Sequence, residues 1–439
     1  MNLKEVKLSG SKSLKELPDL SKATNLEELY INSCPQLTSV SPSIFSLKKL
    51  EKLDLGFCSL TKIISRNHLS SLSYFNLIFC NKLREFSVTS ENLVMLDLSF
   101  TPVNALPSSF GRQSKLEILL LINSGIQNLP SDFKNLTRLR YLNAYNSTEL
   151  HTLTELPPSL QTLDITGCTL LKTVWLPSIS EQLKESRREV LFWNCLKLNR
   201  HSLKAIGLNA HINVMKFAYH HLSAPDENYD DYDRNYRSYQ VRFVYPGSRI
   251  PEWLEYKTTK DYVVIDLSST PRSSPIGFIF CFVISGPKVR TMKGYGFIFY
   301  ITITKDEDES KKDSIYIYMY SPVMRVASDH VCVIYDQRCS HYLNNRAKTL
   351  TKLKIKVKAI AGNMHHQQGV GLKGFGVSPI NTSAYHSFME RINPRATAYH
   401  NVIQQINASA DHSFFQQMHF IPMLAIVLFL SLLWLRCRL

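Results

Sequence analysis

The sequence lacks the short motifs on which most enzymes and metal proteins depend. Its N-terminal half contains no G-x-S-x-G elbow and no H-E-x-x-H helix, and no Walker A sequence occurs anywhere. The nine cysteines include no C-x-x-C pair and none beside a histidine at zinc-ligand spacing, which argues against a disulfide framework and a structural zinc site. No secretory signal opens the chain. We therefore expect a protein of a reducing compartment that is not an enzyme and has no metal, cofactor or small-molecule substrate.

Net charge is nearly absent from the N-terminal part. Residues 1 to 190 hold 21 Lys and Arg against 18 Asp and Glu, and the remainder holds 30 against 18, so +12 of the net +15 follows residue 190. The positive electrostatic potential of this part would attract nucleic acid, phospholipid headgroups or an acidic protein, and the charge alone does not distinguish among them. The length of 439 residues predicts two domains or a repeat array.

A repeated segment is the clearest pattern. The motif L-x-x-L-x-L-x-x-C/S/T recurs in "LEELYINSC", "LEKLDLGFC", "LSYFNLIFC", "LVMLDLSFT", "LEILLLINS" and "LQTLDITGC". Eight copies begin at Leu3, Leu26, Leu50, Leu72, Leu93, Leu116, Leu139 and Leu160, a period of 21 to 24 residues that is typical of leucine-rich repeats. The pattern predicts an α/β solenoid with a short strand in each copy. The cysteines after these strands are expected to be buried structural thiols: Cys34, Cys58, Cys80 and Cys168.

Side chains between the repeat leucines are expected to face outward on the concave side. They are polar in the early copies, at Glu28, Tyr30, Asn32, Lys52 and Asp54. In the middle copies they are apolar: Tyr74, Ile78, Phe79, Met95, Phe100, Ile118, Leu120 and Ile122. A contiguous apolar surface on a solenoid predicts a protein-binding site with Tyr and Phe as anchors. The alternative is that these side chains pack on one another or under a second domain.

The repeat motif becomes weak after Leu171. The charged stretch from Glu181 to Glu189 is interpreted as a solvated convex surface or linker, and "FWNCLKL" as a terminal rung. A helix is predicted to run from Ser202, its N-cap, to about Phe217 and to cover the open end of the solenoid. Its apolar stripe at helical spacing consists of Leu203, Ile206, Ala210, Val214 and Phe217. The two histidines that follow, His220 and His221, are expected to form a surface pair without a ligand.

The second half has the sequence pattern of an antiparallel β-sandwich. Seven apolar runs with turn residues between them predict strands: "VRFVY", "YVVIDL", "GFIFCFVI", "YGFIFYITIT", "SIYIYMYS", "HVCVIYD" and "KLKIKVKAI". In the last run, every lysine from Lys352 to Lys358 lies on one face, as either a binding row or a solvated edge. The preceding loop, Ala224 to Tyr239, could meet a partner through Tyr229, Tyr232 and Tyr236.

These segments together resemble a known arrangement. The repeats, followed by "FWNCLKLN", "YPGSRIPEWLEY" and "IGFIFCFVI", are similar to the C-terminal half of plant TIR-NB-LRR disease resistance proteins, which are intracellular immune receptors. In that family a C-terminal jelly-roll/Ig-like domain, abbreviated C-JID, follows the repeats and carries a P-G-S-x-I-P-x-W motif. The matching residues here are Pro246, Gly247, Ser248, Ile250, Pro251 and Trp253. The motif is expected to turn the chain at Pro246 and to anchor Trp253 in the core.

The resemblance implies a function. Repeats and sandwich together would recognise a pathogen effector or a host target and thereby control receptor activation in defence. The TIR and nucleotide-binding segments of that family are absent, and the first repeat has no N-terminal cap, so we expect part of a truncated receptor. The predicted domains are repeats over 1–180, a terminal rung and capping helix over 181–223, a C-JID-like sandwich over 224–380, a linker over 381–413 and a hydrophobic tail over 414–439.

The tail contains no charged residue from Phe414 to Leu435 when His419 is neutral. This length is sufficient for a transmembrane helix, which predicts a C-terminal membrane anchor on an otherwise cytoplasmic protein. The alternative is a buried or interfacial helix.

Two other functions stay open at this point. The basic second half could bind nucleic acid through Arg237, Arg242 and the lysine strand. A hydrolase could use Cys281 or Cys332 with a histidine.

Overall fold

The computed structural model describes residues 3–65, 69–222, 239–268, 275–286, 296–304, 313–322, 325–362 and 367–393. The chain divides into two compact units, Met1–Tyr385 and His386–Leu439, and the account below concerns the first. The loop tyrosines Tyr229, Tyr232 and Tyr236, Arg237 and the tail 414–439 lie outside the described residues. Among the helices of the described ranges, none combines the length and apolar composition needed to cross a bilayer.

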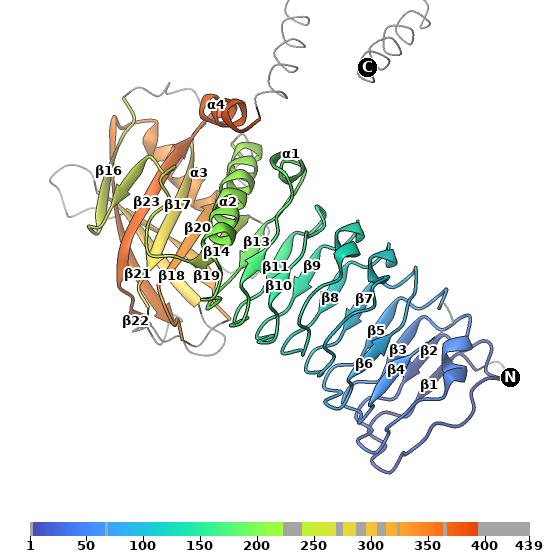
Figure 1. The fold of residues 1–439 in the computed structure, drawn as a ribbon. Coiled ribbons are helices and arrows are strands. Elements are labelled where there is room, and N and C mark those ends of the chain that lie inside the picture. Colours follow the sequence, from blue (N-terminus) through green and yellow to red (C-terminus); the bar gives the residue numbers. More distant parts are fainter. Residues whose placement is uncertain are drawn as a thin grey trace, which may run out of the picture. The chain divides into compact units, whose positions relative to one another are not determined.

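A parallel sheet of short strands forms the concave side of the solenoid (Figure 1). Its strands are β1 (Glu5–Lys7), β2 (Glu28–Tyr30), β3 (Lys52–Asp54), β5 (Tyr74–Asn76), β7 (Met95–Asp97), β8 (Ile118–Leu120), β9 (Tyr141–Asn143), β11 (Thr162–Asp164) and β13 (Glu189–Leu191). They pair in register, so Leu29, Leu53 and Phe75 stack in the interior as successive rungs. The repeat prediction is confirmed, and "FWNCLKL" follows β13 as the terminal rung.

On the convex side the chain returns to the next concave strand through 3-10 helices and short strands. Its elements are η1 (Pro42–Ser46), η2 (Phe110–Arg112), η3 (Ser131–Asn135), the pair β4 (Lys62–Ile64) and β6 (Glu85–Ser87), the pair β10 (Thr152–Leu153) and β12 (Thr173–Val174), and the short α1 (Ile179–Gln182). The expected α/β class therefore needs correction, because this part is a β-solenoid. Repeats of this length leave too few residues after the strand for a longer helix.

The region after residue 239 consists of antiparallel strands. They are β14 (Gln240–Pro246), β15 (Tyr256–Thr258), β16 (Tyr262–Asp266), β17 (Gly277–Ile284), β18 (Gly296–Thr304), β19 (Asp313–Tyr320), β20 (His330–Asp336), β21 (Lys352–Gly362), β22 (Gln367–Gly369) and β23 (Leu372–Ile380). The seven predicted strands are all present. One sheet has the order β14-β20-β17-β23-β15, and the other has β16-β21-β18-β19 with β22 beside β21.

The two antiparallel sheets share one apolar core. Phe282 of β17 stacks on Phe299 of β18, with ring centroids 3.9 Å apart, and so joins the two sheets. Both rings are fully buried, and aromatic contacts of this kind contribute to core stability beyond their buried area. On β21 the buried Leu353, Ile355 and Val357 alternate with exposed lysines, as the sequence predicts.

Helices α2 (Arg200–His220) and α3 (Gln337–Ala347) belong to the first unit, and α4 (Thr382–Ile392) follows β23 in the chain. Helix α2 starts two residues before the predicted Ser202, because the side chain of Asn199 caps it by accepting the backbone N–H of Ser202 at 2.8 Å. Its buried Ile206, Ala210 and Val214 confirm the predicted apolar stripe. The helix packs beside β14, β17 and β20.

A strand and the helix together close the end of the solenoid, so the prediction that the helix covers it is confirmed in part. Helix α2 contacts β12, and the N–H of Val174 in β12 donates to Ser202 Oγ at 2.9 Å. Strand β14 pairs in parallel with β13, with Glu189 opposite Arg242, and on its other edge it pairs antiparallel with β20. The sheet thus continues from the repeats into the antiparallel region without an exposed edge between them. Backbone pairing of this kind holds the two regions together as one unit.

Candidate functional site

In-register pairing arranges the outward side chains of the concave sheet in lanes across the repeats. The first lane consists of Glu5, Glu28, Lys52, Tyr74, Met95, Ile118, Tyr141 and Thr162. Its early members are polar, and Lys52 forms a 2.7 Å ion pair with Glu28. Its middle members Tyr74, Met95 and Ile118 are half-buried. The lane therefore supplies apolar surface only in the middle repeats.

The second lane is mostly polar and divides the predicted apolar strip. It consists of Asp54, Asn76, Asp97, Leu120, Asn143 and Asp164. Each Asp or Asn accepts the backbone N–H two residues later, as Asp97 does from Ser99 at 2.8 Å. Leu120 has no side-chain acceptor, so the backbone N–H of Ile122 donates instead to Ser99 Oγ at 3.2 Å. Leu120 is thus the apolar bridge across the polar lane.

The ionised form of the buried Asp164 carboxylate lowers the unfolding free energy of the protein. Burial raises the pKa of Asp164 to about 6, above its usual value of 3.8. The folded protein therefore binds this proton more tightly than the unfolded chain, and its unfolding free energy falls as the pH rises from about 4 to 6. Asn76 and Asn143 accept the same backbone bond in their repeats without a charge.

Replacement of Asp164 by asparagine is expected to stabilise the protein above pH 6, by up to about 3 kcal/mol at ~1.4 kcal/mol per pKa unit. Urea unfolding of the variant and the wild type at neutral pH and near pH 4 measures this. The gain should vanish near pH 4, where the wild-type carboxyl is protonated. A gain of the same size at both pH values would contradict the raised pKa.

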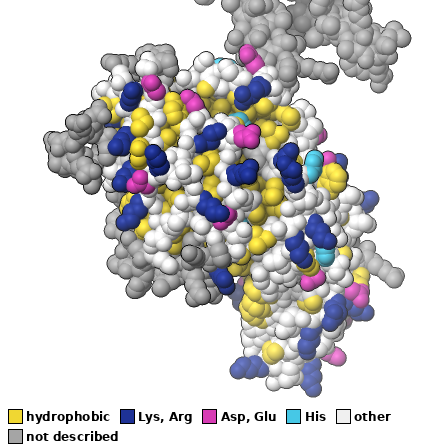
Figure 2. All heavy atoms as spheres, turned by 60° about the vertical axis from the view of Figure 1, so that its left-hand side comes forward, with side chains coloured by type: hydrophobic (Ala, Val, Ile, Leu, Met, Phe, Trp, Pro, Cys, Tyr) yellow, Lys and Arg dark blue, Asp and Glu magenta, His cyan; other side chains and the backbone are white. Residues whose placement is uncertain are grey.

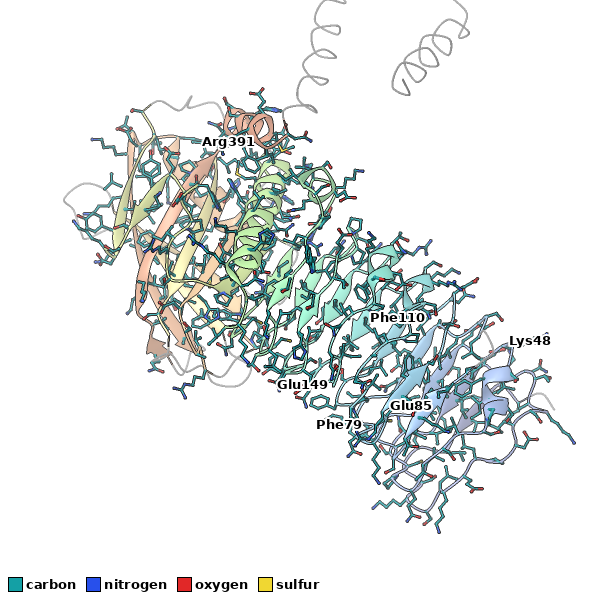
Figure 3. All side chains as sticks on the ribbon, in the orientation of Figure 1. Lys48, Phe79, Glu85, Phe110, Glu149 and Arg391 are labelled. Carbon is teal, nitrogen blue, oxygen red and sulfur yellow. The ribbon has the colours of Figure 1, made fainter. Side chains whose placement is uncertain are left out.

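Phenylalanines occupy the turn after three consecutive concave strands. Phe57, Phe79 and Phe100 stack with centroid distances of 4.9 and 4.1 Å, and we call them the Phe ladder. Phe57 and Phe79 are 50% and 39% exposed, and Figure 3 shows Phe79 at an edge of the solenoid. Phe79 and Phe100 are among the predicted concave residues but lie in the turn after the strand, and Phe57 was not predicted. The signal was a Phe before Cys or Thr in three successive aligned copies, "GFC", "IFC" and "SFT".

The backbone at the Phe ladder is in the left-handed region, with φ of 59°, 58° and 57°. The same turn position in other repeats holds residues that tolerate this conformation better, including Gly10, Asn123, Asn146 and Gly167. A left-handed Phe costs on the order of 1–2 kcal/mol. Three such residues in consecutive repeats, of which Phe57 and Phe79 are exposed and Phe100 is half-buried, cost stability without filling the core, which favours a role in binding.

The predicted apolar residues therefore form two groups. Tyr74, Met95 and Ile118 lie on one side of the polar lane. Ile78, Ile122 and the Phe ladder lie toward its other side. Leu120 connects the groups. We call the whole set with Phe57 the concave apolar surface.

The antiparallel region forms hydrogen bonds to the concave side beyond this surface. Tyr145 donates its hydroxyl to the Pro322 carbonyl at 3.3 Å, and the Asn194 side chain bonds to the backbone of Arg325 and Ala327. These contacts belong to later repeats than the Phe ladder.

The repeat cysteines form a ladder of buried thiols, as predicted. Each Sγ donates to a carbonyl of the preceding repeat, such as Cys80 to Leu55 at 3.2 Å and Cys168 to Ala144 at 3.2 Å. Burial raises the pKa of Cys80 and Cys168 to about 12. The hydrolase alternative requires a reactive thiolate at Cys281 or Cys332. Both thiols are fully buried, and burial raises the pKa of both, which disfavours the thiolate.

The PGSRIPEW motif opens the antiparallel region, although one expected contact differs. Pro246 ends β14 opposite His330, and Gly247 donates to the Asp329 carbonyl at 3.0 Å. Trp253 stays half-buried and stacks on His211 of α2 at 3.9 Å. The neighbouring Leu254 enters the core instead. The reason is the turn at Pro251, which directs Leu254 inward.

The basic residues of the nucleic-acid alternative do not form one patch in the described residues. Arg242 is buried and ion-paired with Glu189 at 2.5 Å. Lys356 pairs with Asp261 at 3.0 Å, and Lys354 lies over the Tyr262 ring. Figure 2 shows Lys and Arg scattered over the antiparallel region, with acidic side chains among them.

The charged stretch Glu181–Glu189 is solvated only in part, because Glu181, Lys184 and Arg188 are exposed. Its other three charged side chains are buried, which corrects their interpretation as solvated surface. Glu185, Arg187 and Glu189 are at most 6% exposed. Arg187 holds both oxygens of Glu185, through Nε at 2.9 Å and Nη2 at 2.6 Å. Burial of these charges is offset by pairing and by hydrogen bonds.

The fold and the concave lanes define a leucine-rich-repeat protein with an antiparallel β-region at its C-terminal end. The chain is homologous to the repeat region of plant TIR-NB-LRR disease resistance proteins. Disease resistance protein RML1B of Arabidopsis thaliana is 31% identical over 303 residues, which is 65% of this chain and 26% of the relative. Disease resistance protein RPP5 of the same species is 37% identical over 186 residues, which is 42% of this chain and 13% of the relative.

Other comparisons are more distant. The disease resistance-like protein DSC1 of Arabidopsis thaliana is 30% identical over 262 residues, covering 56% of this chain and 20% of the relative. This chain thus spans about a quarter or less of these relatives. No family model matches it. Among solved structures, the leucine-rich repeat domain of the type III effector XopL aligns with a TM-score of 0.33 and 21% identity, over 45% of this chain and 69% of that one.

Proposed function

We propose that this chain is the protein-recognition part of a plant immune receptor and that the concave apolar surface contacts its partner. The observation that carries the proposal is the exposed Phe ladder, held in an unfavourable backbone conformation. Stacked, rigid aromatic side chains lose little entropy on binding and are frequent anchors of protein interfaces. Homology to disease resistance proteins supports a pathogen effector or a host target as the partner.

The remaining parts of the proposal concern the whole chain. The antiparallel region acts as a C-JID, which is supported by the PGSRIPEW motif at its first strand. Recognition by repeats and this region together controls receptor activation, without catalysis by this chain. The protein works in the cytoplasm, and its hydrophobic tail attaches it to a membrane.

The triple variant Phe79→Ser, Phe100→Ser, Leu120→Ser is expected to weaken partner binding by at least about 30-fold, since anchor residues contribute ~2 kcal/mol or more. Full-length wild type and variant are used to capture partners from infected plant tissue, followed by binding titrations with each captured protein. The solenoid should stay folded, because all three side chains are outside its core.

The matched control removes exposed apolar side chains elsewhere: Ile64→Ser, Trp175→Ser, Val264→Ser. These side chains are 45%, 57% and 44% exposed. The control should bind like the wild type. Unchanged binding by a folded Phe79, Phe100 and Leu120 variant would remove the concave apolar surface from the proposal.

A further inference from the structure

The outward side chains of the concave strands from β1 to β8 carry an excess of negative charge. The acidic ones are Glu5, Glu28, Asp54 and Asp97, and the basic ones are Lys7 and Lys52. Four negative charges against two positive ones give this part of the surface a net charge of −2, whereas the whole chain carries +15. The concave side is therefore locally negative on a positively charged molecule.

Both lysines of this surface are already paired with glutamates. Lys7 Nζ lies 2.6 Å from Glu5 Oε1, and Lys52 Nζ lies 2.7 Å from Glu28 Oε1. Among the described residues, no lysine, arginine or histidine forms an ion pair with either aspartate. The two aspartates therefore account for the net negative charge of the surface.

The Asp97 carboxylate is nearly buried, with 6% of the residue exposed. Its Oδ1 accepts the backbone N–H of Ser99 at 2.8 Å. Burial raises the pKa of Asp97, the negative charge of Asp54 raises it further, and the hydrogen bonds from Ser99 act in the opposite direction. A desolvated carboxylate in this situation is strongly stabilised by a cation that pairs with it.

The Asp54 carboxylate is better satisfied by the protein itself. Its Oδ1 accepts the backbone N–H of Gly56 and the side-chain amide of Asn76, both at 3.0 Å. Its Oδ2 accepts the side-chain amide of Asn32 at 2.7 Å. Neutral donors thus hold Asp54 in place, and Asp97 is the carboxylate that gains more from the cation of a partner.

Asp97 lies inside the concave apolar surface. It faces Leu120 across the pairing of β7 and β8, and Met95 precedes it on the same face of β7. Tyr74, on the neighbouring β5, lies within electrostatic reach, because burial raises the pKa of its hydroxyl and the charges of Asp54 and Asp97 raise it further. A cationic group on Asp97 would therefore be surrounded by apolar and aromatic side chains, which exclude water and strengthen the pairing.

We propose that the concave apolar surface binds a protein segment in which an arginine or lysine stands between apolar side chains, with the cation paired to Asp97. The apolar side chains of the segment would contact the Phe ladder on one side of the polar lane and Met95 and Ile118 on the other. The cation site rests on the recognition function proposed above and names the chemistry of its partner. The net positive charge of the chain repels a basic segment, so general electrostatic attraction does not account for such a preference.

Selection of peptides from a random library displayed on phage, against the immobilised full chain, tests the proposal. The selected peptides should be enriched in arginine or lysine next to apolar residues. Titrated as synthetic peptides, they should bind Asp97→Asn about tenfold more weakly than the wild type, the loss of one charge-assisted hydrogen bond. Asparagine keeps the bond to the backbone, as Asn76 does with the N–H of Ile78 at 3.0 Å, so the variant should stay folded.

The matched control is Asp266→Asn. Asp266 is exposed on β16 and accepts the backbone N–H of Ser268 at 2.9 Å, so the substitution makes the same chemical change away from the concave lanes. The control should bind the peptides like the wild type. The proposal is overturned if selection does not enrich basic residues, or if the two aspartate variants bind the selected peptides equally well.

The triple variant Phe79→Ser, Phe100→Ser, Leu120→Ser separates the cation site from the recognition function. Peptides that lose binding to this variant but not to Asp97→Asn would leave recognition by the concave apolar surface intact and would remove the cation from Asp97. Peptides that bind the triple variant like the wild type would remove the concave apolar surface itself.

Discussion

Replacement of Trp193 by alanine is expected to lower the free energy of unfolding by about 3–5 kcal/mol. Trp193 is fully buried where the solenoid meets the antiparallel region. Its ring stacks on Phe297 at 5.5 Å and lies tilted against His330 at 5.0 Å, so its loss leaves a cavity bordered by both regions. Equilibrium unfolding in urea, followed by circular dichroism, measures the change.

The control for this prediction is Trp193→Phe. The Trp193 Nε1 has no hydrogen-bond partner, so phenylalanine loses no bond and keeps an aromatic ring in the stack. It should cost clearly less than alanine. Equal losses from the two variants would mean that a specific property of the indole, and not the filling of this space, stabilises the junction.

Replacement of Arg242 by methionine is expected to cost about 3–5 kcal/mol, because it removes the guanidinium that pairs with the buried Glu189 carboxylate at 2.5 Å. Arg242 and Glu189 are 2% and 6% exposed, and they face each other across the β13 and β14 pairing. The positive charge of Arg242 also lowers the pKa of nearby Asp164, against the larger effect of burial. The variant therefore disturbs two carboxylates. Urea unfolding at neutral pH gives the loss.

The double variant Arg242→Met, Glu189→Met separates pairing from packing. Two methionines leave no unpaired charge and should recover most of the stability lost in the single variant. A double variant as unstable as Arg242→Met alone would show that the ion pair is not the source of the loss.

The local patterns of the sequence were sufficient to predict the repeats and strands. Leucines at fixed spacing define one buried face in each copy, and alternation along "KLKIKVKAI" defines the buried face of β21. These features depend on neighbours within a few residues, so no knowledge of distant contacts is needed.

The features that were missed depend on distant partners. Glu189 is buried because Arg242, far along the chain, pairs with it, and Arg187 is buried beside Asn213 of α2. Trp253 was expected in the core, but the stack on His211 holds it at the surface of α2. Phe57 joins the Phe ladder only through stacking between repeats, which no single repeat reveals.

The open end of the solenoid illustrates the same limit. The amphipathic pattern of α2 correctly predicted a helix, yet periodicity does not say which surface the helix covers. Backbone pairing of β13 with β14 closes the concave sheet. Helix α2 packs on the antiparallel strands and also contacts β12 and Glu185 at the end of the repeats.

Site-specific photocrosslinking tests the central claim of partner recognition most directly. A photoreactive phenylalanine analogue is placed at position 79 of the full chain, and separately at position 64, where the exposed Ile64 lies on the convex strand β4. Irradiation in infected plant tissue should give a covalent adduct with a partner protein from position 79 and none from position 64. Adducts from position 64 without any from position 79 would contradict recognition through the concave apolar surface.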